Sequence, residues 1–199
     1  MKRLLSALVA AACLAGCGGG AAAVTAPHAS GGGFAGSTLD PPQPEQPVAL
    51  DDYTGRRIDL RSYLGKPVLL TFLYTHCPDV CPAIAGGLAI MLDDLGPAAR
   101  NVHVVAVSAD PRGDNRRTVA AFLQAHHLTG RMDYLIGTRA QLARVWAAWK
   151  VAATAEGSNA VAHSALVYGI SASGRVLTIY PANFRPSDIV HDLPKLAAM

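Results

Sequence analysis

The sequence contains no run of lysines or arginines, and charged side chains make up only 16% of its 199 residues. The formal net charge is +3. Loss of Lys2 and Arg3 with a cleaved leader would leave 15 basic and 14 acidic side chains, a net charge of +1. Proteins that bind nucleic acid need clustered cations to contact the phosphate backbone, so we expect no nucleic-acid partner.

The N-terminus also lacks an apolar run long enough for a confident membrane span. Its apolar stretch, Leu4–Leu14, follows Lys2 and Arg3 and is shorter than the roughly 20 residues that cross a bilayer. A basic start followed by a short apolar stretch is typical of a signal peptide, which we predict over residues 1–17. An uncleaved anchor helix is the alternative, and both place the rest of the chain outside the cytoplasm.

The predicted leader ends in Leu14-Ala15-Gly16-Cys17, which resembles the lipobox of bacterial lipoproteins. This resemblance implies that Cys17 becomes the lipidated first residue of the mature protein and that Cys13 is lost with the leader. We therefore expect a lipoprotein anchored on the extracytoplasmic, periplasmic side of a bacterial membrane.

Residues 18–47 are rich in glycine, alanine, serine and proline, with GGG at 18–20 and 31–33 and prolines at 41, 42, 44 and 47. Such a composition buries too little apolar surface to offset the entropy lost on ordering. We predict a flexible tether over residues 18–47, stiffer near its prolines. The folded domain is predicted over residues 48–199.

From Val48 onward, short segments alternate between strand-like and helix-like patterns. The order predicts an α/β fold, a thioredoxin-like mixed β-sheet flanked by helices, with an N-terminal β-hairpin addition. The predicted strands cover residues 48–50, 57–60, 68–74, 102–108, 134–136, 165–170 and 175–180. The predicted helices begin near Cys81, at Asp114 or Asn115, near Thr138, and at Pro186 or Ser187.

Two cysteines, Cys77 and Cys81, belong to the predicted domain. Cys77 follows the strand at residues 68–74, and Pro82 fits a helix only in its first turn, which places Cys81 at a helix start. The unpaired N–H groups and the positive end of the helix dipole stabilise a thiolate on cysteines placed near a helix start. The pair is predicted to bind a metal, to act as a redox-active dithiol, or both, and a passive structural disulfide is the alternative.

The C-x-x-x-C spacing is one residue longer than that of C-x-x-C oxidoreductases and suits two ligands of one metal. Thiolates select soft ions, above all Cu(I), and one imidazole would complete a three-coordinate set. His163 is the candidate because it stands just before the strand predicted at 165–170, although a structural histidine is the alternative from spacing alone. His76 is adjacent to Cys77 and is expected to point the opposite way, as neighbours on an extended chain do. The remaining histidines are expected to be solvated, capping or packing residues: His28, His103, His126, His127 and His191.

Three segments, TFLYTHCPDVCP, VSADPRGD and VAHSALVYGISASGRV, together resemble the SCO/SenC family of copper-binding, thioredoxin-like proteins. The resemblance covers about residues 46–199. It implies that Cys77, Cys81 and His163 bind copper as Cu(I) or Cu(II). Two departures are Ala162, where many members have an acidic residue, and Ala109, where Val-Asp-Pro is common. The first could change the orientation of His163, because an acceptor often fixes a ligand imidazole.

The resemblance implies a role in assembling the dinuclear copper site of cytochrome c oxidase subunit II. We expect a copper metallochaperone rather than an enzyme, with a thiol-disulfide reductase activity toward the target cysteines as a further role. The expected partners are that subunit or another copper-site protein, a thiol reductant, and the membrane. The alternative is a thiol-disulfide oxidoreductase or redox sensor without obligatory metal. Tyr74, Asp79 and Asp110 are expected to pack, cap or form loops.

Overall fold

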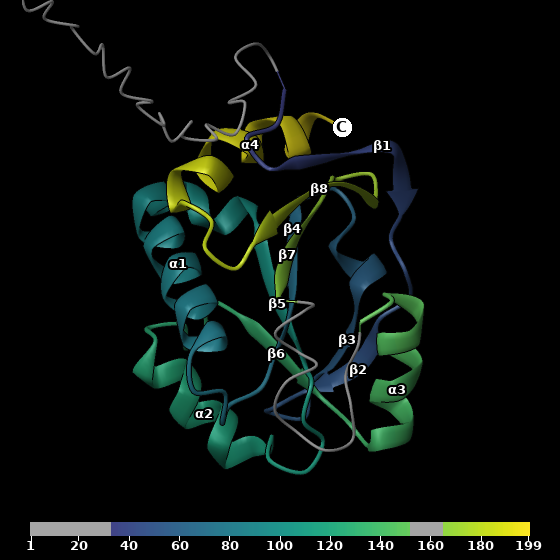
Figure 1. Ribbon diagram of the computed structural model, residues 1–199, viewed down its shortest axis with the longest axis vertical. Helices are drawn as coiled ribbons and strands as arrows, with labels where there is room; N and C mark the ends of the chain where they lie inside the picture. Colours follow the sequence, from purple (N-terminus) through teal and green to yellow (C-terminus); the bar gives the residue numbers. More distant parts are fainter. Residues whose placement is uncertain (1–32, 152–164) are drawn as a thin grey trace, which may run out of the picture.

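A computed structural model describes residues 33–151 and 165–199 (Figure 1). The strands are β1 (Ser37–Pro44), β2 (Ala49–Asp52), β3 (Arg57–Asp59), β4 (Val68–Leu73), β5 (His103–Ser108), β6 (Asp133–Ile136), β7 (Leu166–Ile170) and β8 (Arg175–Pro181). The helices are α1 (Val80–Leu95), α2 (Arg116–Ala125), α3 (Arg139–Ala148) and α4 (Pro186–Ala198), with 3-10 turns η1 (Leu60–Tyr63) and η2 (Gly96–Asn101).

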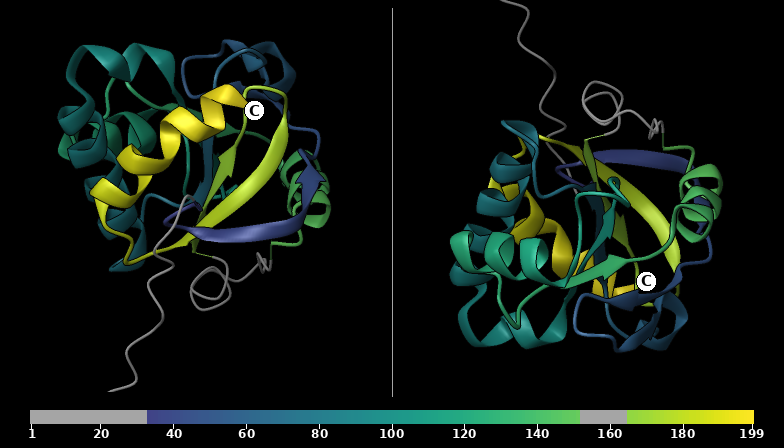
Figure 2. Two further views of the ribbon diagram at one scale, coloured as in Figure 1. Left: turned by 90° about the horizontal axis from the view of Figure 1, so that it is seen from above. Right: turned by 90° about the horizontal axis from the view of Figure 1, so that it is seen from below.

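All eight strands form one mixed sheet in the order β1-β8-β7-β4-β5-β6-β2-β3. Helices α1, α2 and α4 cover one face and α3 covers the other, as the two views of Figure 2 show. The predicted thioredoxin-like mixed sheet with an added hairpin, β2–β3, is confirmed.

The directions of the strands bring several loops to one edge of the sheet. Strands β4, β5 and β6 are parallel, while β7 is antiparallel to β4 and β8 is antiparallel to β7. The carboxyl ends of β4, β5, β6 and β8 therefore lie at the same edge as the amino end of β7. We call this the cysteine edge, and it comprises residues 74–79, 109–115, 137–138, 165 and 182–185.

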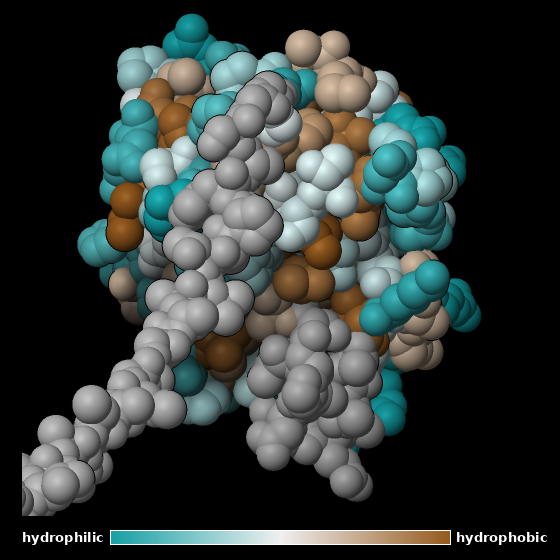
Figure 3. Space-filling view, turned by 45° about the horizontal axis from the view of Figure 1, so that its top comes forward, coloured by the Kyte–Doolittle hydropathy of each residue, from teal (hydrophilic) through white to brown (hydrophobic). Residues whose placement is uncertain are grey.

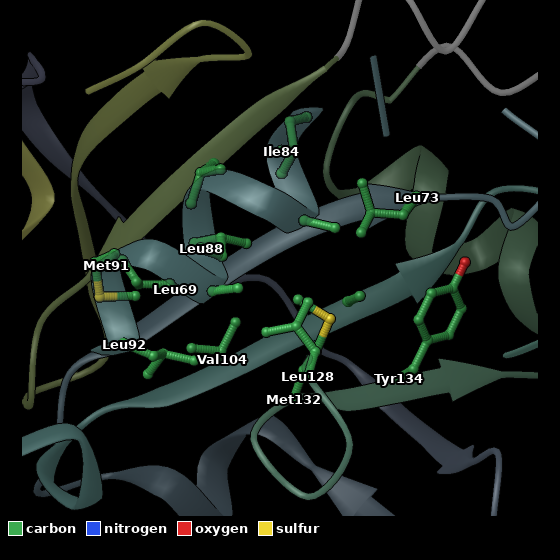
Figure 4. Close-up of a cluster of buried hydrophobic side chains, with 14 of the residues drawn as sticks. Leu69, Leu73, Ile84, Leu88, Met91, Leu92, Val104, Leu128, Met132 and Tyr134 are labelled. Atoms are coloured by element: carbon green, nitrogen blue, oxygen red, sulfur yellow. The ribbon is translucent and has the colours of Figure 1, made fainter. Parts of the chain in front are cut away.

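Strand β4 is buried along its whole length because it lies between β5 and β7 and is covered on both faces. Alternate side chains enter different cores, as the two-residue period of a strand requires. Leu69 and Leu73 pack with α1 (Figure 4), whereas Leu70 and Phe72 lie on the α3 side. The buried strand predicted from this apolar run is confirmed.

Helix α1 lies against β4 and begins where Pro82 predicts, with this proline in the first turn. Its end is set by Gly96, whose φ of +50° lies in the left-handed region that favours glycine. The stretch Val80–Asn101 is long and apolar enough, by composition, to cross a membrane. Seven side chains of α1 are nevertheless buried in the domain core, so packing accounts for its apolar character.

Helices α2 and α3 both begin at capping boxes. The box at Thr138 is the one that the sequence predicts, whereas for α2 it predicts only a cap at Asp114 or Asn115. The Asn115 side chain accepts hydrogen bonds from backbone N–H groups of the first turn of α2. Thr138 and Gln141 form the reciprocal pair at the start of α3. Asp114, the other candidate cap for α2, is buried and has a different set of partners.

The segment before β2 differs from the prediction. We predicted a flexible tether through residue 47, but β1 covers Ser37–Pro44 and pairs antiparallel with β8. An edge strand tolerates prolines because one side of its backbone makes no ladder hydrogen bonds, and the register shifts between Thr38 and Gln43. The folded domain therefore starts before residue 48.

Exposed apolar surface on the domain is scattered. Among residues 33–151 and 165–199, the large apolar side chains that are exposed are Leu64, Ile90 and Met199. On the face shown in Figure 3, hydrophobic residues lie between hydrophilic ones.

Candidate functional site

The two cysteines of the domain are positioned by the β4–α1 loop and the first turn of α1. Cys77 is half-buried, and Cys81, the second residue of α1, is 1% exposed. Both are free thiols, and the backbone N–H of Cys81 donates to Sγ of Cys77 at 3.3 Å. The predicted placement of the pair, one in the loop and one at the helix start, is confirmed.

The surroundings of the pair give the two thiols different acidities. Burial pushes the pKa of Cys77 upward, but hydrogen bonds from the Cys81 thiol, two backbone N–H groups and the Tyr74 hydroxyl outweigh it, leaving the pKa below its usual value. Burial, and then the hydrogen bond to Cys77, raise the pKa of Cys81. The helix start therefore favours a thiolate on Cys77 rather than on the buried Cys81.

Tyr74, which we expected only to pack, also contacts the pair. Burial and its hydrogen bond to Cys77 raise the pKa of Tyr74 to about 12. The phenol is therefore protonated at neutral pH and donates to the Cys77 sulfur. No local sequence pattern signals this contact, because it depends on the turn that the chain makes after β4.

Cys77 is expected to be the nucleophile of the pair. Near neutral pH, iodoacetamide should alkylate Cys77 before Cys81 in the reduced protein, because the thiolate is the reactive species. The lowered pKa of Cys77 predicts that its alkylation rate rises with pH at a lower midpoint than that of a free cysteine. Timed alkylation followed by peptide mass spectrometry measures both rates.

The matched variant for this measurement is Tyr74→Phe, which keeps the ring and removes one donor to the sulfur. It should slow alkylation of Cys77 near neutral pH by a few-fold, because the thiolate loses one hydrogen bond. Equal rates at the two cysteines in the wild type would contradict the assignment.

A buried carboxylate, Asp114, ties the cysteine loop to the neighbouring strands. Its oxygens accept four hydrogen bonds: from the N–H and hydroxyl of Thr75 at 2.8 Å each, from Ser108 at 2.7 Å and from Tyr134 at 2.9 Å. The side chains of Asp114 and Tyr134 are at most 7% exposed. The carboxylate thus fixes the backbone two residues before Cys77. Sequence reasoning treated Asp114 only as a candidate cap, although it is the last residue of the VSADPRGD motif.

Gly113 allows the β5–α2 loop to approach the cysteine loop closely. A Cβ atom at this position would lie 2.3 Å from Oδ2 of Asp110 and 2.9 Å from Nδ1 of His76, closer than real Cβ contacts. Asp110 accepts a hydrogen bond from the N–H of Arg112, in line with the loop role expected for it. His76 therefore packs against this loop beside the cysteines.

The predicted third ligand, His163, lies outside the described residues, as does the predicted lipidation site Cys17. The described chain resumes at Ala165, which is 7% exposed. Ala165 belongs to the buried cluster that contains Cys81 and against which Cys77 packs. The strand that follows His163 thus begins at the cysteine edge.

Among the described residues, no group of three or more histidine, cysteine or acidic side chains is arranged to hold a metal ion. Cys77 and Cys81 therefore supply two soft sulfur donors, and a third histidine, cysteine or acidic ligand would have to come from outside these residues. A thiol pair of this kind suits Cu(I), and it equally suits thiol-disulfide exchange.

Three other histidines have structural surroundings, as we expected from the sequence. His103 lies at the amino end of β5, opposite the cysteine edge, and stacks on Tyr63 with ring centroids 4.0 Å apart. His126 is the C-cap of α2 and contacts Phe122. His191 on α4 lies 2.8 Å from a carboxylate oxygen of the next residue.

Known proteins resemble the chain over most of its length. The sequence model of the SCO1/SenC family matches residues 37–198. The human mitochondrial SCO1 homolog is 27% identical over 150 residues, which is 72% of this chain and 49% of that protein. The chain spans about half the length of the mitochondrial relatives it matches.

Solved structures share the fold. Bradyrhizobium japonicum ScoI with copper bound has a TM-score of 0.66 and 29% identity, covering 76% of this chain and 98% of that one. BsSco, a member of the Sco family of cytochrome c oxidase assembly proteins, has a TM-score of 0.69 at 20% identity, covering 82% and 99%. Because the family model spans well over half of the sequence, this chain belongs to the SCO1/SenC family.

Proposed function

We propose that this protein binds one copper ion through Cys77, Cys81 and His163 and delivers it to the dinuclear copper site of cytochrome c oxidase subunit II. The observation that carries the proposal is the free thiol pair at the start of α1, with a thiolate favoured on Cys77. Copper in the related ScoI structure supports the cargo. BsSco belongs to a family of cytochrome c oxidase assembly proteins, which agrees with a target in that enzyme.

Copper is the cargo, and the chain supplies its ligands. Two thiolates and one imidazole form a soft three-coordinate set that suits Cu(I) and tolerates Cu(II). Burial keeps Cys81 protonated in the free protein, so uptake of copper releases a proton from this thiol. Cys77 is more exposed and more acidic, and it therefore offers the first sulfur to an incoming ion.

The same pair must be reduced before it can hold copper. In an oxidising compartment, Cys77 and Cys81 tend to close as a disulfide, which lacks the thiolates that a metal needs. A separate dithiol reductant transfers two electrons and two protons to the pair, restoring both thiols while its own cysteines become a disulfide.

The acidity of Cys77 favours a second function, thiol-disulfide exchange with no obligatory metal. This function would reduce the cysteines of the copper-site protein before metal arrives. It needs only the cysteine pair, both members of which lie among the described residues. Variants of His163 therefore separate the two functions.

The N-terminal sequence supports a proposal about where the protein is located. We propose that Cys17 carries a lipid and that the chain before β1 connects this lipid to the domain at the periplasmic side of a bacterial membrane. A membrane anchor suits a protein whose proposed target is a membrane subunit.

The test is anaerobic copper titration of the reduced domain, comparing wild type, His163→Ala and Cys77→Ser. The wild type should bind one copper per chain and, as Cu(II), show a thiolate charge-transfer band. Loss of the imidazole should weaken copper binding by more than about tenfold, and Cys77→Ser should abolish the band. Absence of copper uptake by the wild type would reject the proposal.

A control assay measures reduction of a disulfide substrate by the same proteins. Under the metal-free function, His163→Ala keeps thiol-disulfide exchange at the wild-type rate, whereas Cys77→Ser abolishes it. Wild-type copper affinity in His163→Ala, together with intact exchange, would make this second function the better account.

A further inference from the structure

A groove adjoins the cysteine pair, between the first turn of α1 and one side of α2. Its volume is about 380 Å³. Two of its lining residues, His76 and Pro82, are sequence neighbours of Cys77 and Cys81. The α2 side of the lining includes Ala121, Phe122, Ala125 and His126.

The lining of this groove is mostly apolar and carries no carboxylate, ammonium or guanidinium group. Ala121 and Ala125 are exposed, while Phe122 is 7% exposed and packs into the core. Burial and the neighbouring His127 lower the pKa of His126, which is therefore neutral at pH 7. The groove thus suits an apolar side chain of a partner rather than a charged one.

The start of α2, next to the groove, is positively charged. Arg116 and Arg117 are exposed and precede Thr118, another lining residue. Neither arginine has an ion-pair partner within the part of the chain that the structure describes, and the first turn of α2 contains no acidic residue. Cations at a helix N-terminus oppose the helix dipole, so acidic groups on a partner would offset an unfavourable arrangement.

We propose that this groove, together with Arg116 and Arg117, is the docking surface for the copper acceptor. The acceptor presents a metal-binding loop with an apolar side chain for the groove and acidic residues for the two arginines. This inference rests on the proposed function and specifies where delivery takes place.

The chemistry of copper delivery requires the acceptor to contact the surface beside Cys77. In ligand exchange, one copper–sulfur bond to this protein breaks as one copper–sulfur bond to the acceptor forms. The proton of the acceptor thiol passes to the released cysteine, and the oxidation state of copper does not change. The acceptor sulfur must therefore reach a copper ion held at Cys77, which requires the acceptor to cover the surface beside that residue.

The test uses substitutions on the exposed face of α2 that leave the cysteines intact. Ala121→Glu and Ala125→Glu together place two bulky anionic side chains in the groove, and glutamate is a good helix former. The matched control is Ala143→Glu with Ala147→Glu, two exposed positions on α3, which covers the opposite face of the sheet. Each protein is loaded with copper and mixed with the reduced, metal-free copper-site domain of a cytochrome c oxidase subunit II.

The groove variant should bind copper with wild-type affinity but deliver it about tenfold more slowly, because docking is blocked by bulk and by charge repulsion. The α3 control should deliver copper at the wild-type rate. Arg116→Gln with Arg117→Gln should slow delivery at low salt and have little effect at high salt, since screening weakens such attraction.

Failure of the inference and failure of the proposed function give different results. If the wild type binds copper but transfers none to the oxidase domain, the proposed function is wrong. If the wild type transfers copper and the groove variant does so equally fast, the docking surface is wrong. Loss of self-association in the groove variant at unchanged transfer rate would assign the groove to a second copy of the chain and overturn the inference.

Discussion

Substitution of Asp114 by asparagine is expected to lower the free energy of unfolding by about 2 to 4 kcal/mol. One carboxylate oxygen accepts both hydrogen bonds from Thr75, and the other accepts those from Ser108 and Tyr134. An asparagine side chain must turn an NH₂ group toward one of these two sets of donors. The hydroxyls can rotate, but the backbone N–H of Thr75 cannot, so the amide should turn its nitrogen toward Ser108 and Tyr134.

Urea unfolding of Asp114→Asn beside the wild type measures this loss. The control is Asp79→Asn, an exposed carboxylate at the start of α1 that makes no side-chain capping bond. Asp79→Asn should change the free energy of unfolding by no more than about 0.5 kcal/mol, as is usual for surface substitutions. A loss below about 1 kcal/mol for Asp114→Asn would contradict the role of this carboxylate as the tie between β5, β6 and the cysteine loop.

The stability effect should extend to the site itself. Asp114 holds the backbone of Thr75, and Cys77 lies two residues further along the same loop. Loosening this loop should therefore change the alkylation rate of Cys77 even in conditions where the variant remains folded. Asp79→Asn should leave that rate close to the wild-type value, because its side chain does not hold the loop.

Much of the fold was predictable because its signals are local. The apolar run of β4, the proline in the first turn of α1 and the capping box at Thr138 each lie within a few residues. The placement of Cys77 and Cys81 at the strand-to-helix junction follows from those same signals. Such patterns specify elements and the loops between them, and the parallel order of strands then brings the loops to one edge.

The acid–base properties of the site could not be predicted in this way, because they depend on burial and on distant partners. The helix start alone suggests a thiolate at either cysteine, and only the burial of Cys81 assigns it to Cys77. The contact between Thr75 and Asp114 joins residues 39 positions apart. His163 as a ligand remains a prediction from the family resemblance, which the copper titration tests.

Asp192→Asn is expected to release the segment before β1 and to cost about 2 to 4 kcal/mol of stability. Asp192 on α4 is fully buried and accepts hydrogen bonds from the backbone N–H groups of Ala35 at 2.8 Å and Gly36 at 3.0 Å, and from the Tyr180 hydroxyl at 2.9 Å. An asparagine oxygen could keep these three bonds, because all of them go to Oδ2. Its NH₂ group would then replace Oδ1, which also lies 2.8 Å from the N–H of Ala35 and interacts with His191 and Lys195. The hydrogen bond between Ala35 and Asp192 joins residues 157 positions apart. No local sequence pattern could therefore predict that the flexible tether ends well before residue 47.

Hydrogen exchange and limited proteolysis measure the release. The amides of Ala35 and Gly36 should exchange much faster in the variant, and a protease should cut before β1. The control is Asp188→Asn on the same helix, whose partner Arg185 is exposed, so this substitution should change the free energy of unfolding little. Slow exchange at both amides in Asp192→Asn would show that pairing of β1 with β8 holds the segment without this carboxylate.

The Asp192 contacts lie close to the edge of the domain that would meet its proposed target. Ser37 pairs with Ile179 near the carboxyl end of β8, so the chain enters the domain on the side of the cysteine edge. Loss of the Asp192 contacts frees this entry point without touching Cys77 or Cys81. Copper affinity of Asp192→Asn should therefore equal that of the wild type at temperatures where both are folded, and a fall in affinity would mean that the segment before β1 supports the cysteine edge itself.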